Sequence, residues 1–251
     1  MKQASGRIIP ILLMSHGTLV KTHQFKHRGL RLVGDPINSL KIFNELEVDE
    51  LCLLDISASS NRTHPNFDLI EDAACEIFMP IAYGGGIRSA EQAEKLISCG
   101  IEKIVLNSGA LDNPDLINEI ASSLGSQAVV VSVDVKFHRG RYFVLDHRRR
   151  TRRRIRHLEL QNWLREVEAR GAGELLVTAT ERECTWQGAD TKLIETVMTQ
   201  RSAPVVYQGG VASIREANSL IQNFGLSGVA VGSLVVFSEK DGGVLVHMPA
   251  T

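Results

Sequence analysis

Short apolar runs alternate along this chain with stretches in which apolar positions recur every three to four residues. The runs PIAY from Pro80 and KIVLN from Lys103 show no polar alternation, which is typical of strands buried on both faces of a parallel sheet. Between them, SAEQAEKLISCG places Ala93, Leu96 and Ile97 on one helical face and its charges on the other. The strand–helix–strand order predicts a parallel α/β fold.

Eight apolar runs are candidate strands, and amphipathic segments such as PINSLKIFNELE and IEDAACEIF fit between them. Eight strands and their helices in 251 residues predict one domain, a closed (β/α)8 barrel. An open doubly wound sheet is the alternative, because it also alternates strands with helices. The candidate strands are residues 7–13, 50–56, 79–83, 103–107, 128–135, 174–179, 204–207 and 228–232.

The chain also contains its own pattern twice. YGGGIRSAEQA from Tyr83 matches YQGGVASIREA from Tyr207, so that Gly86 and Gly210 correspond at a spacing of 124 residues. Because a sheet whose strand order reverses midway would not repeat its half so faithfully, the repeat favours the barrel. The spacing divides the chain into two half-barrels, at about residues 1–125 and 126–251.

Composition changes this picture little. The net charge at pH 7 is −1 and 43% of the residues are hydrophobic, which suits a domain with a substantial core. The apolar run from Ile8 to Met14 is too short to span a membrane, so no membrane association is expected. Four cysteines without CxxC or metal-ligand spacing predict thiols, a cytoplasmic location and no metal.

One basic segment departs from this neutral balance. HRRRTRRRIRH, from His147 to His157, holds seven arginines in a predicted hairpin or loop after the fifth strand. It is either a solvated loop or a loop on the mouth of the barrel that attracts a polyanionic substrate. Nucleic-acid binding is a third interpretation, but no aromatic platform or groove helix accompanies the charge.

Glycine and small polar residues follow four of the candidate strands, at the end where barrels carry their functional loops. Backbone N–H groups of such loops approach anions closely, and a following helix adds its positive dipole end. Two clusters related by the repeat predict a ligand with a phosphate at each end, although tight turns alone would also use glycine. The clusters are Gly84–Gly86 with Asn107–Gly109, and Gly209–Gly210 with Gly232–Ser233.

Seven segments, in order over about residues 5 to 237, resemble the cyclase subunit of imidazole glycerol phosphate synthase. They are RIIPILL, VGDPIN, DELCLLDISAS, YGGGI, GSQAVVVSVDVK, RGAGELLVT and GVAVGSL. The resemblance implies a (β/α)8 barrel of two similar halves, in agreement with the internal repeat. It also implies a lyase that takes ammonia from a partner glutaminase through the barrel. The ammonia is used at the mouth on a bis-phosphorylated substrate, without a metal or cofactor.

The resemblance also assigns roles to residues. Lys21 matches a lysine of a mobile first loop that covers the substrate, although an ordinary solvated lysine is the alternative. Four charges match a ring at the barrel floor that gates ammonia, where the glutaminase docks; a purely stabilising ring is the alternative. The ring residues are Arg7, Glu50, Lys103 and Glu174, and the phosphate-binding residues are Gly86, Asn107, Ser108, Gly210, Gly232 and Ser233.

The chain departs from the family pattern at its acids and bases. The family uses aspartates at the ends of strands one and five, and Asp134 matches the second whereas Leu13 stands at the first. An Asp-Gly pair after strand six is replaced by Glu183-Cys184, which keeps the charge but adds a Cβ. Near Leu13, His16 is either a titrating group or an ordinary solvated histidine.

Three functions remain open. The missing acid–base partner resembles the paralogous branch found in surface-polysaccharide gene sets, which pairs with a glutaminase and a sugar amidotransferase. In that function Asp134 handles protons, Lys21 closes over a phosphorylated ligand and Glu183 assists. The alternatives are a true cyclase of histidine biosynthesis, and a non-catalytic module that conducts ammonia or activates the glutaminase.

Overall fold

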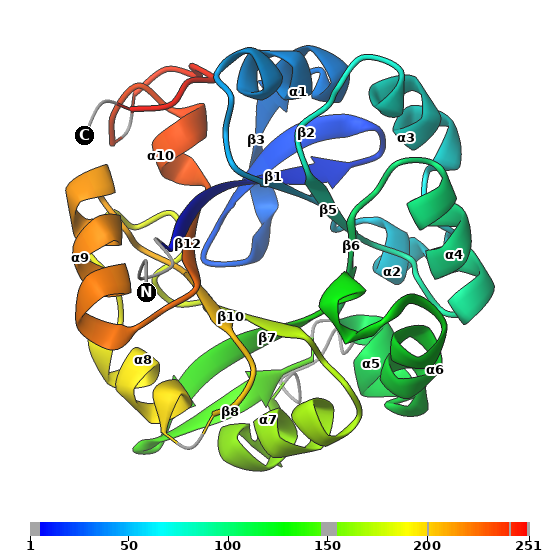
Figure 1. The fold of residues 1–251 in the computed structure, drawn as a ribbon. Helices are drawn as coiled ribbons and strands as arrows, with labels where there is room; N and C mark the ends of the chain where they lie inside the picture. The colour runs from blue at the N-terminus through cyan, green and yellow to red at the C-terminus, as the bar shows by residue number, and fades with distance from the viewer. Residues whose placement is uncertain (1–5, 147–154, 200, 241, 250–251) are drawn as a thin grey trace, which may run out of the picture.

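Eight parallel strands close into a barrel, and helices surround them as a ring in a computed structural model of the chain (Figure 1). The structure describes residues 6–146, 155–199, 201–240 and 242–249. The strands follow one another as β10, β11, β12, β1, β4, β5, β6 and β7, and β7 pairs back to β10. This closure confirms the predicted (β/α)8 barrel and excludes the open sheet.

All eight candidate strands are present, and their bounds differ from the predicted ones by a few residues at most. The barrel strands are β1 (Arg7–Ser15), β4 (Leu51–Asp55), β5 (Ile81–Gly84), β6 (Lys103–Leu106), β7 (Val129–His138), β10 (Glu174–Ala179), β11 (Val205–Gln208) and β12 (Gly228–Val231). The longer helices are α1 (Pro36–Glu45), α3 (Phe67–Ala74), α4 (Ala90–Ser98), α6 (Asp115–Leu124), α7 (Leu160–Ala169), α8 (Thr191–Met198) and α9 (Ile214–Phe224). Short helices are α2 (Ala58–Asn61), α5 (Ser108–Asp112), α10 (Ser233–Val236) and the 3-10 turn η1 (Ser126–Ala128).

Alternation along the strands separates two apolar cores. One set of alternate positions packs against the helices, where the buried side chains of Leu12, Tyr83 and Tyr207 lie. The other set faces the axis and is small or medium in size, because eight strands leave room for little more inside a barrel. Its members are Ile9, Ile11, Cys52, Ala82, Val105, Val130, Leu176, Val206 and Ala230.

The internal repeat extends to individual hydrogen bonds at the helix N-termini. Ser89 caps α4 by accepting from the backbone N–H of Gln92, and Ser213 caps α9 by accepting from that of Glu216. The side chains of Gln92 and Glu216 in turn accept from the backbone N–H of the residue before each cap. Equivalent caps 124 residues apart show that the two halves fold by the same local rules.

A β-hairpin that the sequence interpretation did not predict follows β1. It consists of β2 (Thr18–His23) and β3 (Lys26–Gly34), and Leu13 of β1 lies opposite Val20 of β2. The segment expected to be a mobile loop, which carries Lys21, is therefore a regular strand. His16 and Gly17, with φ of 52° and 77°, form the turn that starts this hairpin.

A second pair of strands follows the fifth barrel strand, as the sequence predicted. β8 (Arg141–Leu145) pairs antiparallel with β7, and β9 (Ile155–Glu159) pairs antiparallel with β8. The segment between β8 and β9 contains most of the arginine run, and residues 147–154 lie outside the described residues. All three interpretations of that run therefore stay predictions.

Candidate functional site

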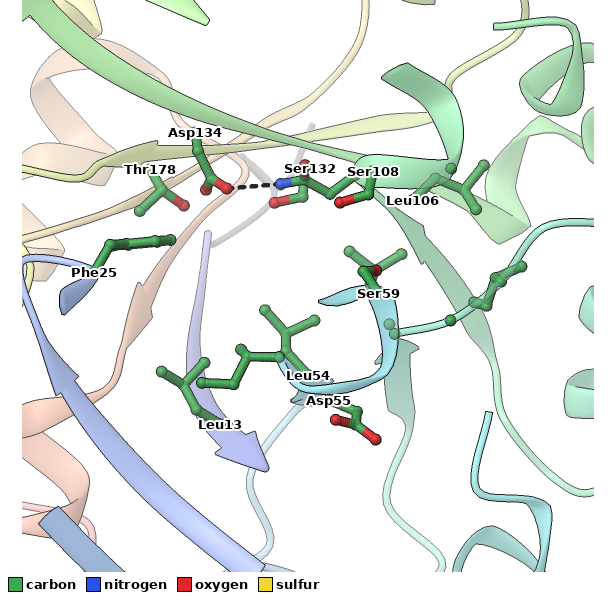
Figure 2. Close-up of a pocket in the computed structure, with 18 of the residues that line it drawn as sticks. Leu13, Phe25, Leu54, Asp55, Ser59, Leu106, Ser108, Ser132, Asp134 and Thr178 are labelled. Atoms are coloured by element: carbon green, nitrogen blue, oxygen red, sulfur yellow. Dashed lines mark hydrogen bonds between the residues drawn. The ribbon is translucent and has the colours of Figure 1, made fainter. Parts of the chain in front are cut away.

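A cavity of about 150 Å³ lies at the C-terminal ends of the barrel strands. The glycines after β5 line it together with Asn107 and Ser108, which follow β6. These residues make up the first cradle, defined as Gly84–Gly86 with Asn107–Gly109. The sequence-predicted cluster therefore faces a real cavity at the mouth (Figure 2).

The backbone of the first cradle requires glycine at its tip. Gly86 has a φ of 74°, and a Cβ there would lie 2.6 Å from the carbonyl oxygen of Thr63. Its repeat mate Gly210 has a φ of 79°, and a Cβ there would lie 2.4 Å from the carbonyl oxygen of Gly188. Neither position accepts a side chain, so both turns hold their backbone in one left-handed form.

The second cradle, defined as Gly209–Gly210 with Gly232–Ser233, borders a much smaller space of about 20 Å³. Lys21 and Glu183 also line this space, and Glu183 and Gln208 line the larger cavity as well. Because the two spaces share these side chains, both cradles open onto the same mouth. The six residues predicted to bind phosphate are thus brought together in two groups around one opening.

The larger cavity has a polar and an apolar wall. Figure 2 shows Asp134, Ser132 and Thr178 on one side and Leu13 and Leu54 on the other. Asp134 is buried within β7, where this strand reaches the mouth, and its Oδ2 accepts a hydrogen bond of 2.7 Å from Nδ2 of Asn107. Leu13 is buried at the end of β1. The mouth therefore holds the predicted carboxylate at β7 and an apolar side chain at β1.

A further carboxylate in this cavity has a structural explanation. Oδ1 of Asp55, after β4, accepts from the backbone N–H and hydroxyl of Ser57 at 2.9 and 2.7 Å, and from the N–H of Ala58 at 3.1 Å. These bonds fix the turn into α2 and engage Oδ1 of the carboxylate. His16 is exposed in its turn and donates its backbone N–H to the Ser57 hydroxyl. The structure does not bring the His16 side chain to the cavity lining.

Lys21 and Glu183 form a buried ion pair at the mouth. Nζ of Lys21 on β2 contacts Oε1 of Glu183, which follows β10. Burial lowers the pKa of the Lys21 ammonium group from its usual 10.5 to about 8, because leaving water disfavours the charged form. Cys184, next to Glu183, keeps the left-handed φ of 59° that suits the glycine of the family pattern.

Four charged side chains meet at the opposite end of the barrel, where β1, β4, β6 and β10 begin. Arg7 contacts both Glu50 and Glu174, and Nζ of Lys103 lies 2.9 and 3.0 Å from their carboxylates. Each cation therefore bridges both acids in a closed ring. The structure brings these four residues together as predicted, and the mutual pairing fits a gate and a purely stabilising ring equally well.

Several lining residues were missed at the level of sequence. Thr178 and Gln208 point toward each other across β10 and β11, with a hydrogen bond of 2.9 Å between their side chains. Each lies two residues after an apolar residue that faces the axis. Because side chains alternate between the two faces of a strand, this spacing would have predicted that both face the axis as well. Thr22 and Phe25 come from the unpredicted hairpin, and no barrel pattern indicates them.

Within the described ranges, no group of three or more His, Cys, Asp or Glu side chains is arranged to hold a metal ion. Over the same part of the chain, none of the helices has the length and apolar character needed to cross a membrane.

Comparison with known proteins places these features in a family. Residues 7–241 match the family described as "Histidine biosynthesis protein". The chain is 42% identical over 245 residues to a putative imidazole glycerol phosphate synthase subunit HisF of Leptospira borgpetersenii, covering 97% of this chain and 94% of that protein. It is also 42% identical to a putative subunit hisF2 of Pseudomonas aeruginosa, over 97% and 95% of the two chains. Identity to subunit HisF of Staphylococcus carnosus is 38%, over 94% and 91%.

Proposed function

This chain belongs to the histidine biosynthesis protein family, with relatives named as imidazole glycerol phosphate synthase subunits, and we propose that it is an ammonia-channelling subunit. In this proposal a glutaminase docks at the barrel floor, and ammonia moves along the axis to a phosphorylated ligand at the mouth. The reaction served is amidation of a bacterial surface sugar. One observation carries the proposal, namely that a charged ring and a cavity lined by glycine and small polar residues lie at opposite ends of one apolar interior.

The interior supports a path for a small neutral molecule. Between the ring and the mouth, the axis-facing side chains are apolar and include the small Ala82 and Ala230. Burial also raises the pKa of the Cys52 thiol, which keeps that group neutral on the axis. Ammonia that enters above the ring would therefore meet no ionised side chain of the described residues with which it could exchange a proton before it reaches the mouth.

The floor also carries a surface suited to a protein partner. Phe78, three residues before β5 begins at Ile81, is 86% exposed, and Leu46 just after α1 is exposed as well. The side chain of Asn44 holds the backbone N–H of Phe78 in place at 2.9 Å. Exposed carboxylates stand close in the chain to the two residues of this apolar floor patch, and one of them, Glu76, pairs with Lys41. The excess of acidic over basic side chains supports a partner with an apolar socket and a basic rim. The carboxylates are those of Glu45, Glu47, Asp49 and Glu76.

Leu13 supports amidation over imidazole formation. Ring closure with cyclisation needs one group to withdraw a proton and another to supply one. The mouth offers Asp134 at β7, whereas the buried Leu13 at β1 transfers no proton. The same leucine also favours a second candidate, a conduit that delivers ammonia to another enzyme without reacting itself.

The ring provides the test of the channel. We expect Glu50→Ala and Lys103→Ala to lower amidation driven by glutamine, with the glutaminase present, at least about tenfold more than amidation driven by added ammonium salts. The reason is that loss of one member leaves the ring with one uncompensated charge and disorders the entrance. Glu102→Ala, which removes an exposed neighbouring charge, serves as the matched control. Equal losses with both nitrogen sources would show that the ring only stabilises the barrel.

A further inference from the structure

The two cradles share one backbone form but differ in what fills them. The first opens onto about 150 Å³ and the second onto about 20 Å³. We propose that the resting mouth binds a single anion, at the first cradle, because the carboxylate of Glu183 occupies the second as an internal counter-ion of Lys21. This inference rests on the proposed function only in taking the mouth as the ligand site.

Glu183 holds the hairpin over the second cradle through three separate contacts. Its Oε1 contacts Nζ of Lys21, and its Oε2 accepts from the backbone N–H of Phe25 at 3.3 Å. Its carbonyl oxygen accepts from the backbone N–H of Gln24 at 3.2 Å. Since both charged side chains are almost fully buried, a second anion would have to displace one carboxylate from a desolvated ammonium group.

The tip of the hairpin carries backbone strain that these contacts offset. Gln24 and Phe25 form the turn between β2 and β3 with φ values of 53° and 56°. Neither is glycine, and a bulky residue such as phenylalanine adopts this left-handed form only when its surroundings impose it. The bonds from Gln24 and Phe25 to Glu183 are such a constraint, so this glutamate sets the position of the whole hairpin tip.

Around the second cradle, space is limited by the lysine itself. A Cβ built on Gly232 would lie 3.4 Å from Cε of Lys21, which is ordinary van der Waals contact. The lysine stem therefore lies next to the turn that carries Ser233. Lys21 supplies the positive charge of an anion site, and the carboxylate of Glu183 supplies the anion.

The first cradle, unlike the second, borders a cavity that none of the described side chains of the protein fills. Thr22, on the same strand as Lys21, lines its cavity and is only 5% exposed. Among the residues that the structure describes, the Thr22 hydroxyl oxygen has no hydrogen-bond partner. A buried hydroxyl without a partner is costly, and this one lies in a residue that lines the larger cavity. The substrate class that fits is a molecule with one terminal phosphate at the first cradle and a body that extends into the larger cavity.

Phosphate binding tests this asymmetry without a glutaminase or an acceptor. Inorganic phosphate would be titrated into the chain and its stoichiometry and dissociation constant followed by calorimetry and ³¹P NMR. We expect one phosphate per chain, with affinity reduced at least about tenfold by Ser108→Ala, since the hydroxyl hydrogen bond is made to a charged group. The repeat-related Ser233→Ala should leave phosphate affinity unchanged, because Glu183 closes that cradle, and the exposed Ser219→Ala on α9 serves as the control.

Glu183→Gln keeps the size of the side chain and removes its charge. In that variant we expect a second phosphate per chain, which Ser233→Ala then removes. Two phosphates on the unaltered chain, none on it, or a single phosphate on a folded Glu183→Gln variant would each overturn the proposal. If Glu183→Gln fails to fold, the comparison of Ser108→Ala with Ser233→Ala in the unaltered background still decides which cradle is open. Failure of the channel test with this stoichiometry intact would contradict the function and leave the asymmetry standing.

Discussion

Leu13 and Asp134 show how single residues set the chemistry at this mouth. Both side chains are buried at axis-facing positions where their strands reach the mouth. The side chain of Asn107 fixes the orientation of the Asp134 carboxylate. Their inward direction was predictable from the period of two along β1 and β7. The pairing of Lys21 with Glu183 was not, because 162 residues separate the two and no local pattern links them.

Asp134→Asn distinguishes a catalyst from a conduit. The amide keeps the shape of the carboxylate but does not accept a proton, so ammonium-driven amidation should fall at least about 100-fold. Product would be quantified by mass spectrometry, with the exposed Glu181→Gln at the same rim as control. Unchanged output would mean that the chain only conducts ammonia.

The same assay addresses histidine biosynthesis. Supplied with ammonium and the bis-phosphorylated cyclase substrate, the unaltered chain should form no imidazole product, because the buried Leu13 provides no carboxylate on β1 to act together with Asp134. Turnover near 1 s⁻¹, on the order of typical enzymes, would restore the cyclase interpretation.

At the scale of elements, the barrel units were predictable and the hairpins only in part. Strands such as β5 are continuous apolar runs, and helices such as α4 carry strong periodicity and a clear N-terminal cap. The β1–β2 turn also had a local signal, since His16-Gly17 stands between two runs rich in apolar residues. The β2–β3 turn had none, because Gln24-Phe25 contains no glycine and its form depends on Glu183.

The duplicated caps make a prediction at this scale. Ser89→Ala and Ser213→Ala should each lower the free energy of unfolding by about 1 kcal/mol, since each serine accepts from an otherwise unbonded helix N–H. Urea unfolding followed by circular dichroism measures both, and Ser98→Ala near the end of α4 is a control without a cap to lose. A large difference between the two cap variants would contradict the equivalence of the halves.

At the scale of the whole molecule, the repeat predicted more than any single motif. Equivalent turns at Gly86 and Gly210 place both cradles at one mouth, as a half-barrel spacing of 124 residues requires. The repeat could not reveal that the cradles differ in use. That difference comes from the hairpin after β1, which folds back to contact Glu183 beyond β10.

The apolar floor patch makes the last prediction, for assembly. Phe78→Ser should weaken binding of the glutaminase about 30-fold, the effect of losing one aromatic anchor at an interface centre. Folding should be unaffected, because a side chain that is 86% exposed contributes little to the core. Phe137→Ser, which changes a 41% exposed phenylalanine on the β7–β8 hairpin beyond the mouth, is the matched control.

Calorimetric titration with the glutaminase measures both variants, and sedimentation of the chain alone tests whether the patch joins two copies instead. Full glutaminase affinity in Phe78→Ser, or a dimer of the unaltered chain that this substitution dissolves, would contradict docking at this patch.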